Sequence, residues 1–302
     1  MNNIQSNHPT KFPPTAFVLL AVLLWSTGGL FIKGTAFDAF TVNAGRSFFA
    51  AITVAVFTFR KGLKPDKFTL LASLFYAGTL SCFVYANKTT TAANAIFLQY
   101  TAPIYILILA PFILKEKFRV SDLVTVVLCL AGMSLFFLET PSAENRLATD
   151  IFTGNIIALA SGVFFGLYFI FLRHPRILEN KNPALSVFYG NIIIVVLMVP
   201  LVFNDPPTQF NSKDVLAILF LGVFQIGIAY VLFTKGIAAG VRSLDASIIG
   251  FIEPLLNPIW VFLILGERPS RWAILGGAII IAAVIFHTIK SNREKSVSNK
   301  TH

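Results

Sequence analysis

The stretch that decides the fold is Ser247–Glu267, SIIGFIEPLLNPIWVFLILGE, which has an earlier counterpart in Ile96–Glu116, IFLQYTAPIYILILAPFILKE. Each is an apolar run about long enough to cross a bilayer as a helix of about 20 residues. In each, a proline (Pro103 or Pro254) is followed 13 residues later by the glutamate that ends the stretch. The two copies are offset by 151 residues, half of the 302-residue chain. This shared spacing predicts a chain built from two copies of one membrane unit.

The composition is that of a membrane protein. Hydrophobic residues make up 56% of the chain and charged residues 13%, with a mean hydropathy of +0.75, whereas soluble domains carry about 25% charged residues. The net charge of +10 does not indicate nucleic-acid binding, because the basic residues fall between apolar runs. The two cysteines, Cys82 and Cys129, lie inside apolar segments, so we expect neither a disulfide nor a metal site. No cofactor is expected.

Ten apolar segments are long enough to cross a bilayer, whose hydrocarbon core of about 30 Å requires about 20 residues of helix. Runs of this length lack the alternation of a barrel strand, so the predicted fold is an all-α membrane protein with ten transmembrane helices. The segments are 16–36, 39–59, 68–87, 92–114, 120–138, 151–172, 184–203, 214–234, 244–265 and 271–289.

The distribution of lysine and arginine predicts the orientation of these spans. With the N-terminus placed inside, the inner side carries 17 of these residues and the outer side six, while Arg46 lies within a span. We therefore expect a multi-pass protein with both termini in the cytoplasm. The expected location is the cell membrane, or the inner membrane where the source has two.

The number of spans in each half has a structural consequence. Because five is odd, the second half starts from the opposite side of the membrane, and the two copies run in opposite directions. The prediction is therefore two inverted five-helix repeats, the architecture in which secondary transporters bind substrate between the repeats near the midplane. The repeats cover 16–138 and 151–289, with an external linker at 139–150 and cytoplasmic tails at 1–15 and 290–302.

Taken together, these features resemble the EamA-like ten-helix exporters of the drug/metabolite transporter superfamily. The resemblance rests on AANAIFLQYTAPIYILILAPFILKEK and GFIEPLLNPIWVFLILGERPS, on WSTGGLFIK at 25–33 and on Arg46 within NAGRSFFAA, and it covers 16–289. It implies a central cavity lined mainly by helices 1, 3, 4, 6, 8 and 9, and transport by alternating access. The cargoes that it implies range over amino acids, metabolites, vitamins and nucleotide-linked sugars.

Glu253 is the most informative single position. It lies about nine residues into the ninth predicted span, or about 14 Å along a helix, which is close to the bilayer centre. An ionised carboxylate facing lipid there costs several kcal/mol, so Glu253 is expected to face protein, water or a cation. Two interpretations stay open: a group that binds a proton or the amine of a substrate, and a structural acid beside a kink at Pro254.

The face of the helix that carries Glu253 also carries Asn257. The offset of 151 residues places Gln99 on the corresponding face of the first copy, so Gln99, Glu253 and Asn257 are expected to meet between the two repeats. The alternative is that Gln99 and Asn257 only hold helices together, with about 0.6 kcal/mol from each hydrogen bond.

Other candidates for a substrate cavity are polar and aromatic side chains on four further spans. Tyr85 and Gln225 lie on stripes of small and polar residues, which line a cavity or allow close helix packing. Trp25, Ser26 and Tyr168 are candidates by their position in the first and sixth spans. For Trp25, filling of the bundle core is the alternative.

Arg46 lies about 10 Å below the outer surface, too deep for a routine anchor at the interface. We expect it to pair with a carboxylate or with backbone carbonyls, as a structural charge, with contact to a substrate carboxylate as the alternative. Gly162 and Gly166 indicate close helix packing. His287, near the inner end of the last span, is given no role.

The predicted function is secondary active transport of a small metabolite, an amino acid or a related compound, with export as the direction. Protons are the candidate coupling ion, and Glu253 is their candidate carrier. The alternatives are uptake of a metabolite or vitamin by the same fold and, remotely, an intramembrane enzyme, which requires groupings of His, Asp or Ser at span ends. We expect no enzyme, a monomer or homodimer, and no partners beyond substrate, protons and membrane lipid.

Overall fold

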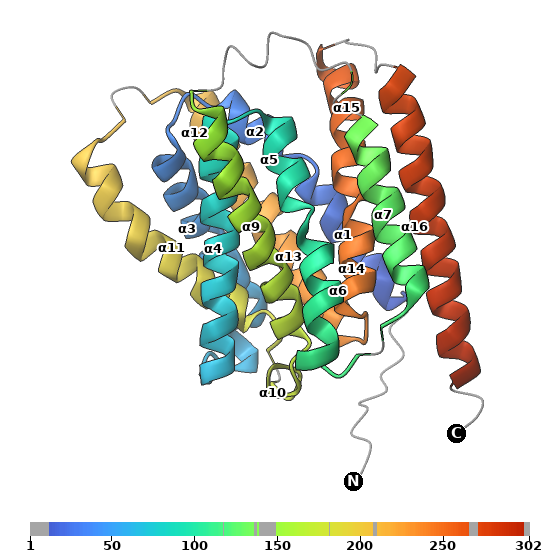
Figure 1. Ribbon diagram of the computed structural model, residues 1–302. Coiled ribbons are helices and arrows are strands. Elements are labelled where there is room, and N and C mark those ends of the chain that lie inside the picture. Colours follow the sequence, from blue (N-terminus) through green and yellow to red (C-terminus); the bar gives the residue numbers. More distant parts are fainter. Residues whose placement is uncertain are drawn as a thin grey trace.

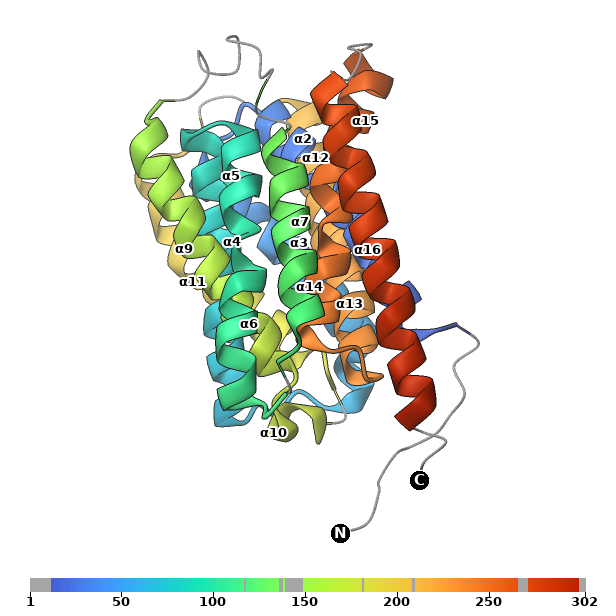
Figure 2. The ribbon, with the colours of Figure 1, turned by 45° about the vertical axis from the view of Figure 1, so that its right-hand side comes forward.

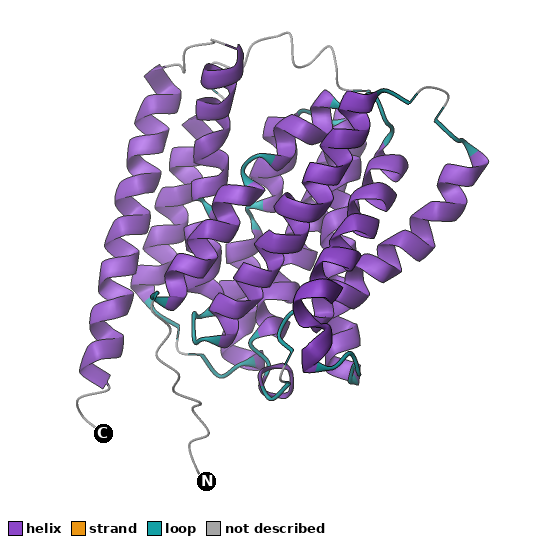
Figure 3. Ribbon diagram, turned by 180° about the vertical axis from the view of Figure 1, so that it is seen from behind, coloured by secondary structure: helices purple, strands orange, loops and turns teal. Residues whose placement is uncertain are grey.

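The molecule is a bundle of helices that run between two opposite ends (Figure 1). The computed structural model describes residues 12–116, 118–135, 138, 149–180, 182–207, 210–265 and 271–298. A few side chains within these helices, that of Asn257 among them, lie outside the described part. Every regular element among the described residues is helical (Figure 3), which confirms the predicted all-α fold.

The first half of the chain crosses the bundle five times. Its helices are α1 (Pro14–Trp25) with α2 (Gly28–Gly34), α3 (Ala39–Thr58) with the short η1 (Phe59–Lys61), α4 (Lys67–Thr89), α5 (Ala92–Gln99) with α6 (Ala102–Ile113), and α7 (Val120–Ser134).

The second half also crosses the bundle five times. Its helices are α9 (Ile151–Leu172) with the short α10 (Pro175–Leu178), α11 (Leu185–Asn204), α12 (Ser212–Phe220) with η3 (Leu221–Ile228) and α13 (Ala229–Ala238), α14 (Ser243–Gly250) with α15 (Ile252–Leu265), and α16 (Arg271–Ser298).

The bundle is built to lie in a membrane. Eight of the described helical stretches are long and apolar enough to cross a bilayer, and α7 is a shorter apolar helix. Large apolar side chains such as Phe48, Val196 and Phe286 are exposed on the outside of the bundle. The chain is therefore a multi-pass membrane protein, built from helices because helices satisfy their backbone hydrogen bonds internally in an apolar layer.

The two halves enter the bundle from opposite ends. Helix α1 begins and α16 ends at the same end, called here the termini face (Figures 1 and 2). The short helix α10 and the connection between α6 and α7 lie at this face as well. Helix α9, the first helix of the second half, begins at the other end, called here the opposite face.

Polar side chains mark where several helices begin. In each case a side-chain oxygen accepts a hydrogen bond from a backbone N–H of the first turn, which stabilises a helix start by about 1 kcal/mol. The capping residues are Asp38 for α3, Asp66 for α4, Thr91 for α5, Asp150 for α9 and Asn211 for α12.

Glycines allow α9 to lie directly against the junction of α5 and α6. A Cβ atom on Gly162 would lie 2.7 Å from Thr101 Oγ1 and 2.8 Å from the Leu98 carbonyl oxygen. A Cβ atom on Gly166 would lie 3.0 Å from the Ala102 carbonyl oxygen. The two glycines therefore let backbones approach as small residues do in membrane helix pairs, and they position α9 beside the candidate site.

Candidate functional site

The fourth and ninth crossings are both interrupted, and at equivalent places. Helix α5 ends at Gln99 and α6 begins at Ala102, while α14 ends at Gly250 and α15 begins at Ile252. With the offset of 151 residues, the end of α5 coincides with the end of α14. Each break comes just before a proline near the start of the following helix. Proline lacks the backbone N–H that a continuous helix needs at that position.

The two breaks lie against each other. Tyr100, at the first break, and Phe251, at the second, are equivalent positions in the two copies, and their ring centroids are 5.2 Å apart. Interrupted helices that meet in this way are typical of transporter binding sites, because they present backbone groups and helix ends inside the membrane.

Glu253 lies at this junction and faces protein rather than lipid. Its side chain is 8% exposed, and its Oε2 accepts a hydrogen bond of 2.8 Å from the hydroxyl of Tyr100. The same hydroxyl lies 2.7 Å from the carbonyl oxygen of Gly250. The two copies are thus joined by a polar contact between α5–α6 and α14–α15.

Gln99 does not take part in this contact. Its Nε2 donates to Ser161 Oγ at 2.9 Å, and Ser161 in turn donates to the Thr79 carbonyl oxygen at 2.9 Å. Gln99 thereby connects α5 with α9 and α4. The side chain of Asn257 lies outside the described residues, so the predicted meeting of Gln99, Glu253 and Asn257 stays a prediction.

An aromatic cluster fills the space next to the junction. Trp25 is 4% exposed, and its ring centroid lies 4.7 Å from that of Tyr230, 4.9 Å from that of Phe233 and 6.0 Å from that of Phe165. The rings come from α1, α9 and α13. They bring helices of both halves into contact at the centre of the bundle.

Tyr168 and two further tyrosines extend this cluster. The ring centroid of Tyr76 lies 5.3 Å from that of Tyr168 and 4.8 Å from that of Tyr230. All three side chains are buried. Tyr168 therefore belongs to the same buried aromatic region as Trp25.

Gln225 lies in η3, a π-helical segment within the eighth crossing, and such segments are frequent at functional sites. Its Nε2 lies 3.5 Å from the Trp25 carbonyl oxygen, and its Oε1 has no hydrogen-bond partner among the described residues. Next to Trp25, Ser26 accepts a hydrogen bond of 3.0 Å from Trp260 Nε1. Gln225 and Ser26 thus lie at the break between α1 and α2.

A narrow crevice runs between the break and the aromatic cluster. Trp25, Tyr100, Phe165 and Gly250 are among its lining residues, and it is too tight to admit a water molecule. This crevice between the described residues is therefore closed to water in this conformation.

Tyr85 lies apart from these groups. It is 37% exposed on α4, and its ring centroid lies 6.2 Å from that of Phe40, another exposed residue. The described contacts do not bring it to the junction of the broken helices.

Arg46 is completely buried in α3. Its guanidinium donates to the Asn43 side-chain oxygen at 3.4 Å and to the Leu80 carbonyl oxygen at 3.2 Å. Its third nitrogen, NH1, has no partner among the described residues, and none of the described carboxylates forms an ion pair with Arg46. Backbone and amide oxygens therefore hold this charge.

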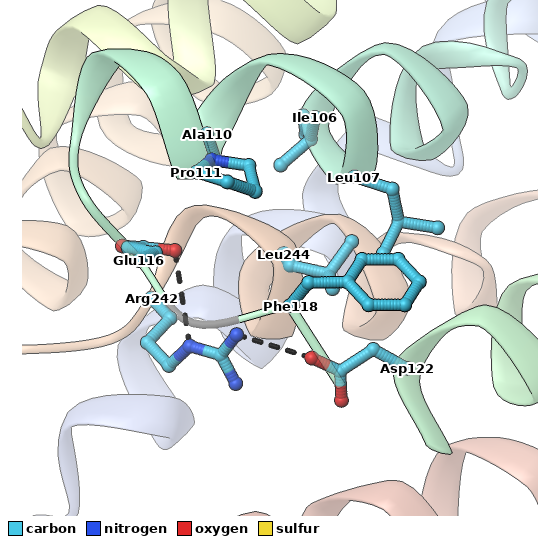
Figure 4. A pocket seen from close by; sticks show the side chains of 9 residues that line it. All are labelled: Ile106, Leu107, Ala110, Pro111, Glu116, Phe118, Asp122, Arg242 and Leu244. Atoms are coloured by element: carbon cyan, nitrogen blue, oxygen red, sulfur yellow. Dashed lines mark hydrogen bonds and ion pairs between the residues drawn. The ribbon is translucent and has the colours of Figure 1, made fainter. Parts of the chain in front are cut away.

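A second polar region, the termini-face cluster, lies at the end of the bundle where α16 ends. Arg242, which precedes α14, occupies its centre. Arg242 NH2 lies 3.1 Å from Asp122 Oδ2, NH1 lies 3.5 Å from Asp245 Oδ1, and Nε lies 3.8 Å from Glu116 Oε2. Figure 4 shows Arg242 between Glu116 and Asp122. The members of the cluster are Glu116, Asp122, Arg173, Arg242, Asp245, His287 and Ser291.

The remaining contacts of the cluster join further helices to it. Arg173, at the end of α9, lies 3.8 Å from Glu116 Oε1. His287 Nε2 lies 3.0 Å from Asp245 Oδ1, and Ser291 donates to Asp245 Oδ2 at 2.9 Å. Burial raises the pKa of the Glu116 carboxyl above its usual value, although Arg242 and Arg173 act in the opposite direction.

Sequence reasoning missed several residues of these two regions. Tyr100 and Tyr230 look like ordinary core aromatics in an apolar run. The signal for Tyr100 is its place three residues before Pro103, at the start of the repeated stretch. The members of the termini-face cluster come from five separate segments, and His287 carries no local motif.

Comparison with known proteins gives a consistent picture. The profile of the EamA-like transporter family matches residues 14–138 and 152–289. An uncharacterized transporter of Archaeoglobus fulgidus is 27% identical over 277 residues, covering 91% of this chain and 96% of the relative. Solute carrier family 35 member G1 of Homo sapiens is 23% identical over 283 residues, which cover 88% of this chain and 76% of that relative. One solved crystal structure aligns with 93% of this chain and 98% of its own, at a TM-score of 0.76 and 20% identity. That likeness shows the fold alone.

Proposed function

Because this chain belongs to the EamA-like transporter family, we propose that it is a secondary active transporter that exports a small metabolite, an amino acid or a related compound. Transport proceeds by alternating access between two inverted repeats. The protein lies in the cell membrane with both termini in the cytoplasm, as the excess of basic residues at the termini face favours. Uptake by the same route is the alternative direction.

The observation that carries the proposal is the buried contact between Tyr100 and Glu253 at the junction of the two broken helices. A carboxyl group inside the membrane is costly and marks a pathway for ions or substrate. Here it lies between the two copies of the repeat, where a movement of one copy against the other changes its surroundings. This is the place where a transporter of inverted repeats binds its substrate and coupling ion.

The hydrogen bonds at Tyr100 support a proton as the coupling ion. The single hydroxyl hydrogen of Tyr100 has two acceptors, Glu253 Oε2 at 2.8 Å and the Gly250 carbonyl oxygen at 2.7 Å. When Glu253 is protonated, its own hydrogen is donated to Tyr100, and the hydroxyl hydrogen of Tyr100 is donated to Gly250. When Glu253 is ionised, it accepts from Tyr100. Glu253 therefore keeps a partner in both states, which a group that loads and releases a proton requires.

The closed crevice supports alternating access. In this conformation the crevice next to Trp25 and Tyr100 is too tight for water, and the termini-face cluster ties the helices together below it. A substrate site there becomes accessible only when the helices separate at one face. Gln225 and Ser26, at the break between α1 and α2, are the polar groups that then face the opened space.

The experiment that tests the proposal is counterflow in proteoliposomes. Vesicles containing the purified protein are loaded with unlabelled amino acids, and influx of a radiolabelled mixture of the same amino acids is measured. The expected result is a saturable influx that the internal amino acids stimulate, because a carrier exchanges substrate faster than it returns empty. An influx that equals that of protein-free vesicles would remove amino acids as cargo, and single-channel currents would contradict a carrier mechanism.

A further inference from the structure

His287 lies between two carboxylates that come from different halves of the chain. Its Nε2 is 3.0 Å from Oδ1 of Asp245 on α14, and its Nδ1 is 3.7 Å from Oδ1 of Asp122 on α7. His287 is 5% exposed. Both ring nitrogens therefore face carboxylate oxygens in a buried setting.

The number of hydrogens on the imidazole decides how many of these contacts are favourable. A neutral imidazole has one N–H and one bare nitrogen, so it donates to one carboxylate and turns a lone pair toward the other. A protonated imidazole has two N–H groups and a positive charge that both carboxylates attract. In the structure Nε2 lies within hydrogen-bond distance of Asp245 and Nδ1 within ion-pair distance of Asp122, so protonation strengthens both contacts.

The charges around His287 are those of the termini-face cluster. Its carboxylates are Glu116, Asp122 and Asp245, and its guanidinium groups are Arg173 and Arg242. Asp122 and Asp245 each contact Arg242, and a protonated His287 adds a second cation beside both carboxylates. Lys290, on the same helix as His287, is exposed and is not among the described contacts of the cluster.

The cluster also connects the two repeats. Glu116 and Asp122 belong to the first half, and Arg173, Arg242, Asp245 and His287 to the second. The termini face can open only if contacts between these two groups separate. A charge that strengthens the contacts therefore stabilises the closed face, and its loss favours opening.

We propose that His287, together with Asp122 and Asp245, is a proton-binding site that locks the termini face in its closed form. Protonation of His287 places a cation between the two carboxylates and holds α7, α14 and α16 together. Deprotonation removes that cation from between the repeats and releases the lock. The site is separate from Glu253, which lies at the junction of the broken helices. The inference rests on the alternating-access cycle of the proposed function.

The test measures opening of the termini face as a function of pH. Ala110, a buried residue of α6 that lines the small pocket beside Glu116 and Arg242, is replaced by cysteine in a chain that carries Cys82→Ala and Cys129→Ala. The protein is placed in lipid nanodiscs, and its reaction with N-ethylmaleimide is followed at about pH 5.5 and about pH 8, on either side of the ordinary histidine pKa of about 6.5. Each rate is divided by the rate for the denatured protein at the same pH, which removes the pH dependence of the thiol itself.

The expected result is slow labelling at the lower pH and faster labelling at the higher pH. We expect the ratio to rise about fivefold or more, the lower end of the range for coupled sites. His287→Asn abolishes this rise, because asparagine does not titrate. The matched control is His174→Gln: His174 is the other described histidine and stacks on Phe68 with ring centroids 4.3 Å apart. This control keeps the full rise.

Two outcomes would overturn the inference: a ratio that does not change with pH in the unaltered cluster, and a rise that His287→Asn leaves intact. If His287→Asn fails to fold, Asp245→Asn serves in its place and is expected to reduce the rise, since it removes one of the two carboxylates. Counterflow measured on the same preparations separates this inference from the proposed function. A flat labelling ratio with intact counterflow removes the lock alone, and absent counterflow with a pH-dependent ratio removes the transport proposal alone.

Discussion

The hydroxyl group of Tyr100 contacts both Glu253 and the backbone of the second broken helix. Tyr100 is buried, and its hydroxyl is the described partner of both Glu253 Oε2 and the Gly250 carbonyl oxygen. A buried polar group that loses its partner costs about 1–3 kcal/mol. Removal of this one oxygen is therefore expected to affect both stability and proton coupling.

Tyr100→Phe tests this at the residue scale. We expect a loss of about 1–3 kcal/mol of stability, measured by thermal unfolding in detergent, together with a changed pH dependence of amino-acid counterflow. Tyr85→Phe is the matched control, because Tyr85 lies exposed beside Phe40, and it should change neither quantity. Equal behaviour of the two variants would mean that the Tyr100 hydroxyl has no special role.

At the residue scale, the burial of Glu253 could be predicted from the sequence, but its hydrogen-bond partner could not. The burial of Glu253 follows from the cost of a carboxylate in lipid, which depends only on its depth in an apolar run. The partner of Glu253 did not follow, since Gln99 and Tyr100 are adjacent and the helix break turns them to different neighbours. Arg46 was expected to pair with a carboxylate or with carbonyls, and amide and carbonyl oxygens hold it in the described part of the chain.

At the scale of elements, the interrupted helices α5–α6 and α14–α15 set the geometry of the site. The sequence predicted one span at 92–114 and one at 244–265, with a kink at Pro254 as one interpretation, and the breaks themselves are a finding of the structure. The glycines of α9 could be recognised as packing residues from their spacing alone. The π-helical segment η3 could not be predicted, because no local residue pattern distinguishes it from an ordinary apolar helix.

Gly162→Ala tests the packing of α9 against the junction of α5 and α6. The added Cβ would lie 2.7 Å from Thr101 Oγ1 and 2.8 Å from the Leu98 carbonyl oxygen, so neither backbone can stay in place. We expect a destabilisation of about 1–3 kcal/mol, as for an overpacked core, seen as a lower midpoint of thermal unfolding. Gly34→Ala is the control, because nothing lies within 4 Å of the Cβ atom that this substitution adds. A midpoint for Gly162→Ala equal to that of Gly34→Ala would refute the tight contact.

At the scale of the whole molecule, several polar contacts join the two halves, among them the Tyr100–Glu253 contact at the centre and the termini-face cluster at one end. The all-helical membrane fold could be predicted because the length and apolarity of the segments suffice for it. The cluster could not, because its members are isolated charges in five segments that only the packing of the two halves brings together.

The orientation in the membrane is tested by labelling cysteines on intact cells. Lys64→Cys lies in the 60–67 connection at the termini face, and Ser142→Cys lies in the 139–150 linker, outside the described residues. An impermeant maleimide is expected to label Ser142→Cys and to spare Lys64→Cys, because basic connections stay in the cytoplasm. The reverse pattern would invert the proposed topology.

The central claim is that Glu253, between the two repeats, carries the proton that drives transport. The most direct measurement is amino-acid flux driven by a pH gradient in proteoliposomes, for Glu253→Gln beside Glu179→Gln, an exposed glutamate on the termini face. We predict that Glu253→Gln abolishes the gradient-driven flux but retains counterflow, and that Glu179→Gln retains both. Gradient-driven flux that is undiminished in Glu253→Gln would contradict the account.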